Sequence, residues 1–78
     1  MGENASEAAQ GTLKFGFETL KAHRVVAFSH AENTASLRLM DRLGLQPEGR
    51  LRQTRWWQGG WSDEVVYAML ESEWPGSG

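Results

Sequence analysis

The first part of the sequence has the hydrophobic spacing of an amphipathic helix. Four apolar side chains recur every three or four residues: Ala9, Leu13, Phe17 and Leu20. This spacing places them on one face of a helix. Asn4 followed three residues later by Glu7 is typical of a capping box at a helix start. These features predict a helix over residues 4–22, with Phe15 off the apolar face and in need of a second surface to cover it.

A short strand and a second helix are predicted next. Residues 24–29 are apolar and β-branched without alternation, which is typical of a strand covered on both faces. Asn33 is a good N-cap for a helix over residues 34–43, where apolar side chains again have helical spacing. Gly44 suits the left-handed residue that follows a helix, with an apolar residue behind it.

The last third of the sequence predicts a hairpin. Residues 50–58 and 61–73 are two strand-like runs, and Gly59 and Gly60 between them favour a tight connection. Residues 47–49 predict a turn before the first of these runs. The resulting order is α-β-α-β-β. We therefore expect an α/β fold with two helices and a three-stranded mixed sheet.

Composition narrows the classes of protein to which this chain can belong. The 78 residues allow one small domain, which we place over residues 4–74, followed by a disordered tail over residues 75–78. Eight basic and ten acidic residues give a formal charge of −2, which argues against a protein that binds duplex nucleic acid. No apolar run is long enough to cross a membrane, and the start of the sequence lacks the apolar core of a secretory signal. We expect a cytoplasmic protein that does not bind membranes.

Several kinds of site chemistry are excluded or disfavoured. The sequence contains no cysteine, so it has no disulfide, thiolate ligand or cysteine nucleophile. His23 and His30 have no acidic residue at helical spacing, and we predict no metal site.

One stretch carries a recognisable signature. Residues 33–52 begin with Asn-Thr-Ala-Ser, continue through Leu-Gly-Leu and end with Glu-Gly-Arg-Leu-Arg. This run resembles the N-x-A-S … l-G-F … E-G-x-l-r signature of GNAT N-acetyltransferases, in particular the ribosomal-protein-alanine acetyltransferase branch. Residues 5–8 resemble the opening of the cofactor-binding helix in that branch, and residues 60–70 resemble its ending. The resemblance covers roughly residues 4–74 and implies the C-terminal half of a GNAT fold.

The resemblance implies acetyl transfer from acetyl-CoA to an amine. Ser36 matches the family serine that gives a proton to the departing thiolate. Asn33 matches a residue that contacts the coenzyme A arm, and Asn4 and Ala5 match the start of the cofactor-binding helix. The residues alone leave a simpler alternative open for two of these positions. Asn33 then serves only as an N-cap, and Ser36 is only a small polar residue in the first helical turn.

The sequence also departs from the family pattern. Arg55 stands where the related branch has a glutamate that acts as general base, and arginine stays protonated. Asp63 or Glu64 could replace that glutamate through water, although Asp63 matches a family aspartate with a structural role. Met40 stands where many GNAT enzymes have a proton-donating tyrosine, and Glu3 stands where the pyrophosphate loop has a glycine. These departures predict a truncated module that binds coenzyme A weakly. They also put in question whether the chain is active by itself.

The family order predicts a self-association surface. The strand at residues 24–29 should lie beside a strand that the 78 residues do not supply, which leaves an edge open for pairing. We therefore expect a homodimer or a higher oligomer, completed across that edge.

Two alternatives to an enzyme remain. The chain could be a non-catalytic protein-interaction module on a GNAT-derived scaffold, or it could bind a nucleotide or single-stranded nucleic acid through a basic and aromatic cluster. That cluster contains Arg50, Arg52, Arg55, Trp56 and Trp57.

Overall fold

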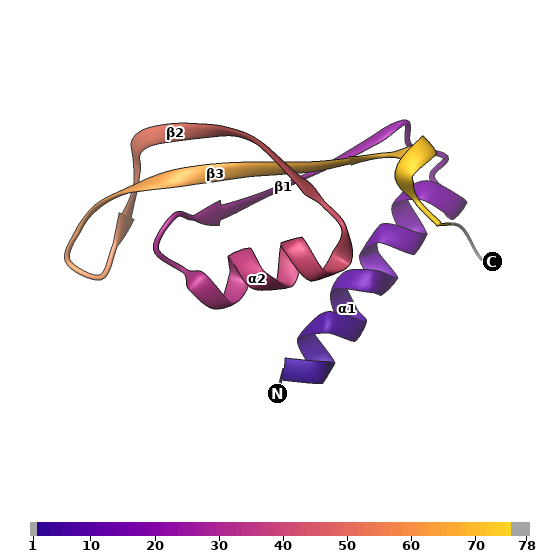
Figure 1. Cartoon of the computed structure of the whole chain (residues 1–78), viewed down its shortest axis with the longest axis horizontal. Helices are drawn as coiled ribbons and strands as arrows, with labels where there is room; N and C mark the ends of the chain where they lie inside the picture. Colours follow the sequence, from indigo (N-terminus) through magenta and orange to yellow (C-terminus); the bar gives the residue numbers. More distant parts are fainter. Residues whose placement is uncertain (1, 76–78) are drawn as a thin grey trace. The chain divides into compact units, whose positions relative to one another are not determined.

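The computed structural model describes residues 2–75, with side chains described from residue 7 onward. Figure 1 shows the order of the elements. They are the helix α1 (Gly2–Lys14), the π-helix η1 (Phe15–Thr19), β1 (Arg24–His30), α2 (Thr34–Leu43), β2 (Gln46–Trp57), β3 (Gly60–Leu70) and the short 3₁₀ helix η2 (Glu71–Glu73). The chain divides into a terminal unit, Met1–Val25 with Met69–Gly78, and a central unit, Val26–Ala68. The two units are described separately.

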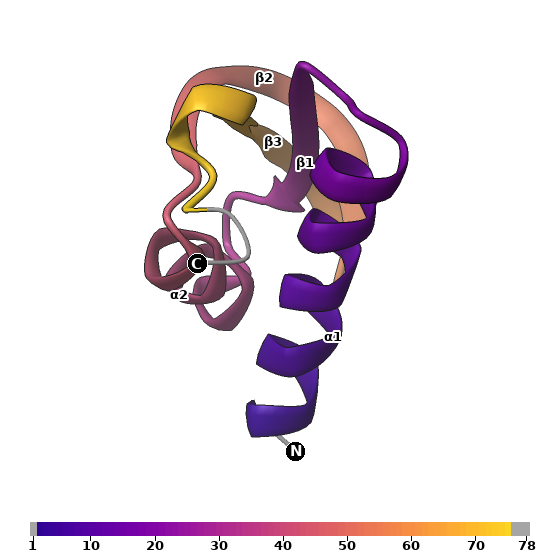
Figure 2. The same cartoon turned by 90° about the vertical axis from the view of Figure 1, so that its right-hand side faces the viewer.

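The predicted first helix is present in the terminal unit, with two differences. It begins at Gly2, and its last turn widens into η1, which follows α1 as one continuous helix in Figure 2. Leu13 and Phe17 are buried as predicted, whereas Leu20 is exposed. The backbone nitrogen of Leu20 donates to the carbonyl oxygen of Phe15, five residues back. This wider turn adds a residue and rotates Leu20 off the apolar face.

The two ends of the chain meet in the terminal unit. The ring of Trp74 stacks on Phe17 with centroids 5.6 Å apart, and its indole nitrogen donates to Glu18 Oε2 at 2.9 Å. The backbone nitrogen of Glu71 donates to the carbonyl oxygen of His23 at 2.8 Å, and the side chains of these two residues are 3.0 Å apart. The last residues that the structure describes are thus fastened to the first helix.

The second helix, α2 in the central unit, has the bounds that the sequence predicts. Gly44 follows it with a φ of 93°, in the left-handed region that favours glycine. The backbone nitrogen of Gly44 donates to Asp41, and that of Leu45 donates to Met40. These two bonds are the Schellman arrangement, which satisfies carbonyl groups at the end of the helix. Leu45 is buried, as expected for the apolar residue of this motif.

The α/β class and the element order are confirmed, and the sheet is antiparallel rather than mixed. Its strand order is β1-β3-β2, so β3 lies between the other two strands. Tyr67 of β3 is buried, and the carboxylate of Asp41 on α2 acts on its hydroxyl. Burial, together with that carboxylate, raises the pKa of Tyr67.

The predicted turn at residues 47–49 lies within β2. Pro47 pairs with Tyr67 and Gly49 pairs with Val66, so Glu48 is one extra residue in β2. A β-bulge of this kind bends the strand without ending it. The turn prediction was therefore wrong, because proline and glycine mark a bulge in this strand.

A wider irregularity follows in β2. Leu51 pairs with Glu64 and Arg55 pairs with Ser62, so residues 52–54 lie opposite Asp63 alone. Gln53, the middle residue of the three, has a backbone φ of 53°. We call residues 52–54 the wide bulge, and it shapes the polar contacts of the hairpin.

The strand β1 lies at the edge of the sheet and is not covered on both faces within the described residues. Ser29 is buried, but Val26 and Phe28 expose 39% and 53% of their surface. Phe15 of the terminal unit is similarly exposed, at 53%. Several apolar side chains are therefore exposed and are not packed over by other described residues. No helix within residues 2–75 has the length and apolar character to cross a membrane.

Candidate functional site

The two principal site candidates meet at the start of α2. Asn33 precedes the helix, and its side-chain oxygen Oδ1 accepts a hydrogen bond from the backbone nitrogen of Ser36 at 3.2 Å. This is the N-cap that the sequence predicts. The other group of the same side chain, Nδ2, has no partner among residues 2–75. Capping therefore uses one end of the amide and leaves its donor end free.

Ser36 is the third residue of α2, and its side chain is half-buried. Its hydroxyl makes no hydrogen bond within the described part of the chain. The start of a helix carries a partial positive charge from aligned peptide dipoles and unpaired backbone N–H groups. A hydroxyl at this position is suited to give a proton to a developing anion.

The other two candidates, Asn4 and Ala5, lie in the terminal unit. Both belong to the start of α1, which begins at Gly2 and therefore includes Asn4 within the helix. Their side chains lie outside the described part. The first backbone N–H groups of a helix have no partner within it, and such groups bind phosphate. Asn4 is the third residue of α1, so its backbone N–H belongs to this set, whereas Ala5 is the fourth and its N–H is bonded within the helix.

Both carboxylate oxygens of Asp63 accept hydrogen bonds, one from Arg50 and one from the wide bulge. Its Oδ2 accepts from Arg50 Nε at 2.7 Å, and its Oδ1 accepts from the backbone nitrogen of Gln53 at 2.8 Å. The hydrogen bond from Arg50 is the main reason that the pKa of this carboxyl is lowered, and the bond from Gln53 adds to it. A carboxylate with a lowered pKa is a weak base, so Asp63 has the structural role that the sequence favoured.

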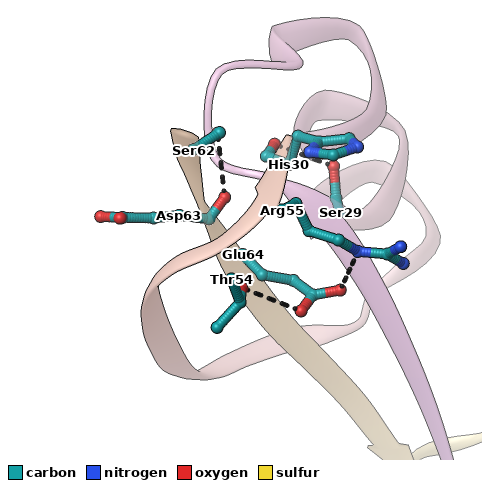
Figure 3. A network of polar contacts seen from close by, with 7 residues as sticks. All are labelled: Ser29, His30, Thr54, Arg55, Ser62, Asp63 and Glu64. Carbon is teal, nitrogen blue, oxygen red and sulfur yellow. Dashed lines mark hydrogen bonds and ion pairs between the residues drawn. The ribbon is translucent and has the colours of Figure 1, made fainter. Parts of the chain in front are cut away.

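Glu64 points to the other side of β3, as Figure 3 shows. It is 8% exposed, and its two oxygens accept from Thr54 Oγ1 at 3.2 Å and from Arg55 Nε at 3.0 Å. Arg55 stands in place of the family glutamate. It therefore forms an ion pair with Glu64, one of the two carboxylates that could replace that glutamate as general base. The pairing depends on the register across the wide bulge, which no local pattern in the sequence reveals.

His30 is a feature to which the sequence analysis gave no role. It is the last residue of β1. The centroids of its ring and of the Trp57 ring are 4.2 Å apart, and the ring planes make an angle of 32°. Its Nδ1 atom is buried and has no hydrogen-bond partner among the described residues. Its backbone oxygen accepts from Ser29 Oγ and from the backbone nitrogen of Asn33. The described residues contain no group of three or more side chains that could hold a metal ion.

Comparison with known proteins identifies the family. The sequence profile of the acetyltransferase (GNAT) domain matches residues 3–46, which run from α1 through α2. The chain belongs to the GNAT acetyltransferase family. Members of this family use acetyl-CoA as their acetyl donor.

Individual relatives agree with this assignment. The chain is 41% identical over 70 residues to the uncharacterized N-acetyltransferase YnaD of Bacillus subtilis, a match that covers 90% of this chain and 41% of YnaD. It is 36% identical to the uncharacterized N-acetyltransferase p20 of Bacillus licheniformis, over 92% of this chain and 40% of p20. The crystal structure of a GNAT-family acetyltransferase from Bacillus anthracis is 46% identical, with a TM-score of 0.77, over 88% of this chain and 42% of that one. This GNAT chain thus spans about two fifths of the length of the curated relatives that it matches.

Proposed function

We propose that this chain provides the coenzyme A-binding and proton-donating part of an N-acetyltransferase that acts on an amine in the cytoplasm. The observation that carries the proposal is the start of α2. There Asn33 keeps a free amide donor while it caps the helix, and Ser36 keeps a free hydroxyl. Acetyl-CoA supplies the acetyl group in activated form, as a thioester.

The two residues have separate roles in the proposed reaction. Asn33 Nδ2 donates a hydrogen bond to the coenzyme A arm. The amine nitrogen bonds to the acetyl carbon while the carbon–sulfur bond breaks, and Ser36 Oγ–H gives its proton to the departing sulfur. The amine nitrogen loses its own proton to solvent, from which the serine hydroxyl is restored. The positive end of the α2 dipole favours the negative charge that develops on sulfur.

The proposal assigns no general base to the hairpin. Asp63 is held by Arg50 and the wide bulge, and Glu64 is held by Arg55 and Thr54. Taking a proton from an amine would require either carboxylate to give up these bonds. We therefore expect slow transfer by this chain alone, with the amine deprotonated by solvent.

The proposal includes self-association through β1. This strand lies at the sheet edge and exposes Val26 and Phe28. An edge strand with an apolar face favours pairing with another copy. Sedimentation velocity should show a dimer or larger species that Phe28→Arg converts to monomer. Leu51→Arg, which changes an exposed apolar residue on the other edge strand, should leave the oligomer intact. A folded wild-type monomer at all concentrations would contradict this part of the proposal.

Calorimetric titration with acetyl-CoA, followed by a thiol-release assay with a set of amines, tests the enzyme itself. We expect saturable binding. Ser36→Ala should leave the affinity unchanged and slow thiol release by about a hundredfold, the scale of general-acid catalysis. Ser72→Ala, an exposed serine of η2, is the matched control. If acetyl-CoA does not bind at about 1 mM, a concentration that detects even weak sites, the chain is instead a non-catalytic interaction module.

A further inference from the structure

The β2–β3 hairpin carries tryptophan and arginine side chains on both of its faces, and the two faces differ in how far these side chains are covered. On the face that includes Arg55 and Trp57, the arginine pairs with the buried Glu64 and the indole lies against His30. These side chains are satisfied within the central unit. The opposite face, which we call the tryptophan face, contains Trp56, Trp61, Arg52, Gln53 and Asp63.

Two indole rings are open to solvent on the tryptophan face. Trp56 and Trp61 are directly paired across the hairpin, and they expose 63% and 61% of their surface. Their rings are perpendicular, at 89°, with centroids 5.4 Å apart. In such an edge-to-face pair one ring meets the other with its edge, so its own two faces stay uncovered. The pair therefore stabilises the hairpin and still presents a flat aromatic surface.

A positive charge without an ion-pair partner lies on the same hairpin, at the wide bulge. Arg52, Gln53 and Asp63 line an open hollow at the wide bulge. The carboxylate of Asp63 is already paired with Arg50 at 2.7 Å. Arg52 itself forms no ion pair within residues 2–75 and acts on Asp63 only through space. The hollow therefore keeps one surplus guanidinium, a group that binds phosphate oxygens in a two-pronged way.

We propose that the tryptophan face is a nucleotide site, separate from the coenzyme A site at α2. The base stacks on the exposed indole surface of Trp56 and Trp61, and its phosphate is held by Arg52 in the hollow. Stacking on an aromatic ring accepts any base, because every base has a π-face. A free nucleotide and a single-stranded nucleic acid share this chemistry. One surplus charge on a chain of net charge −2 predicts weak binding with one phosphate contact.

The probes are adenosine monophosphate and a single-stranded adenosine oligonucleotide about eight nucleotides long, a length that one small domain can cover. Binding is followed by quenching of tryptophan fluorescence. We expect saturation with at least one probe and a shallow salt dependence, with a slope of log K against log salt of about −0.7 for a single contact. An oligonucleotide affinity more than about tenfold above that of the mononucleotide identifies a single strand as the ligand, and equal affinities identify a free nucleotide.

Arg52→Ala should weaken binding roughly tenfold while the thermal unfolding curve stays unchanged, since Arg52 is exposed. Trp61→Ala should weaken it by a similar factor, and circular dichroism checks that the hairpin persists. Arg38→Ala, an exposed arginine on α2, is the matched control and should bind as the wild type does. The proposal is overturned if neither probe saturates or if Arg52→Ala binds normally. None of these results bears on acetyl-CoA binding at Asn33.

Discussion

Asn33 and Ser36 are joined by a hydrogen bond that engages only part of each residue. The bond uses the side-chain oxygen of Asn33 and the backbone nitrogen of Ser36, 3.2 Å apart. The amide donor of the first and the hydroxyl of the second remain available. Helix capping and ligand binding are therefore compatible at this position, and substitutions can separate them.

Asn33→Ser retains a capping oxygen but removes the amide donor. We expect it to leave the unfolding temperature nearly unchanged and to weaken acetyl-CoA binding about fivefold, the scale of one hydrogen bond. Asn33→Ala should weaken binding similarly and also cost about 1 kcal/mol of stability through the lost cap. Calorimetry and thermal unfolding measure the two effects. Normal acetyl-CoA affinity in Asn33→Ser would mean that Asn33 is only a cap.

Gly44→Ala should destabilise the chain by about 1–2 kcal/mol, because an alanine in the left-handed region brings its Cβ too close to the backbone. The φ of 93° at this position is what creates the cost. Gly11→Ala is the matched control. Gly11 lies in α1 with open space around it, and the same substitution there should stabilise by about 0.5–1 kcal/mol. Chemical denaturation measures both, and two changes of the same sign would contradict the prediction.

Arg55 and Glu64 should show energetic coupling in a double-mutant cycle. Their side chains are 57% and 11% exposed, so solvent screens the pair from one side. We expect a coupling free energy of roughly 0.5–1 kcal/mol, measured from the unfolding of Arg55→Ala, Glu64→Ala and the double variant. Glu32→Gln, an exposed residue before α2, should have almost no effect. Strictly additive single effects would show that the ion pair adds nothing.

Asp63 should make the hairpin sensitive to acid. Its folded pKa lies below the ordinary value of 3.8, so the carboxylate stabilises the fold above that pH. This stabilisation is lost as the pH falls through 3.8 toward the folded pKa. Asp63→Asn should therefore be less stable than the wild type near neutral pH, and the difference should shrink in acid. Thermal unfolding across this range tests the prediction, and a difference that does not depend on pH would refute it.

Local signals in the sequence were enough to predict α2. Asn33 and Gly44 act on backbone groups within a few residues of themselves, so the sequence nearby determines both ends of the helix. The capping role of Asn33 follows from the same signals, whereas the site roles of Asn33 and Ser36 were predicted from the resemblance to the GNAT signature. The fold class follows from the order of such local elements.

The hairpin was less predictable because its contacts depend on register. Nothing near Pro47 indicates that β3 will continue opposite it, so the bulge at Glu48 was taken for a turn. The pairing of Arg55 with Glu64 likewise requires three residues of β2 to face Asp63 alone. Leu20 was misplaced because the π-helical turn that rotates it is invisible in a periodicity of 3.6. The two features of the hairpin thus depend on residues distant in sequence, whereas the π-helical turn is local but does not follow the regular helical period.

The contact between Phe17 and Trp74 has a consequence for the way the terminal unit opens. Phe17 of η1 is buried, and its ring packs against a residue far away in the sequence. Glu18 and His23 also find their partners in the last segment that the structure describes. Contacts of long sequence separation form only after the intervening chain has been closed into a loop. Release of residues 71–74 would therefore uncover the Phe17 ring, so the two segments of the terminal unit should form and come apart together.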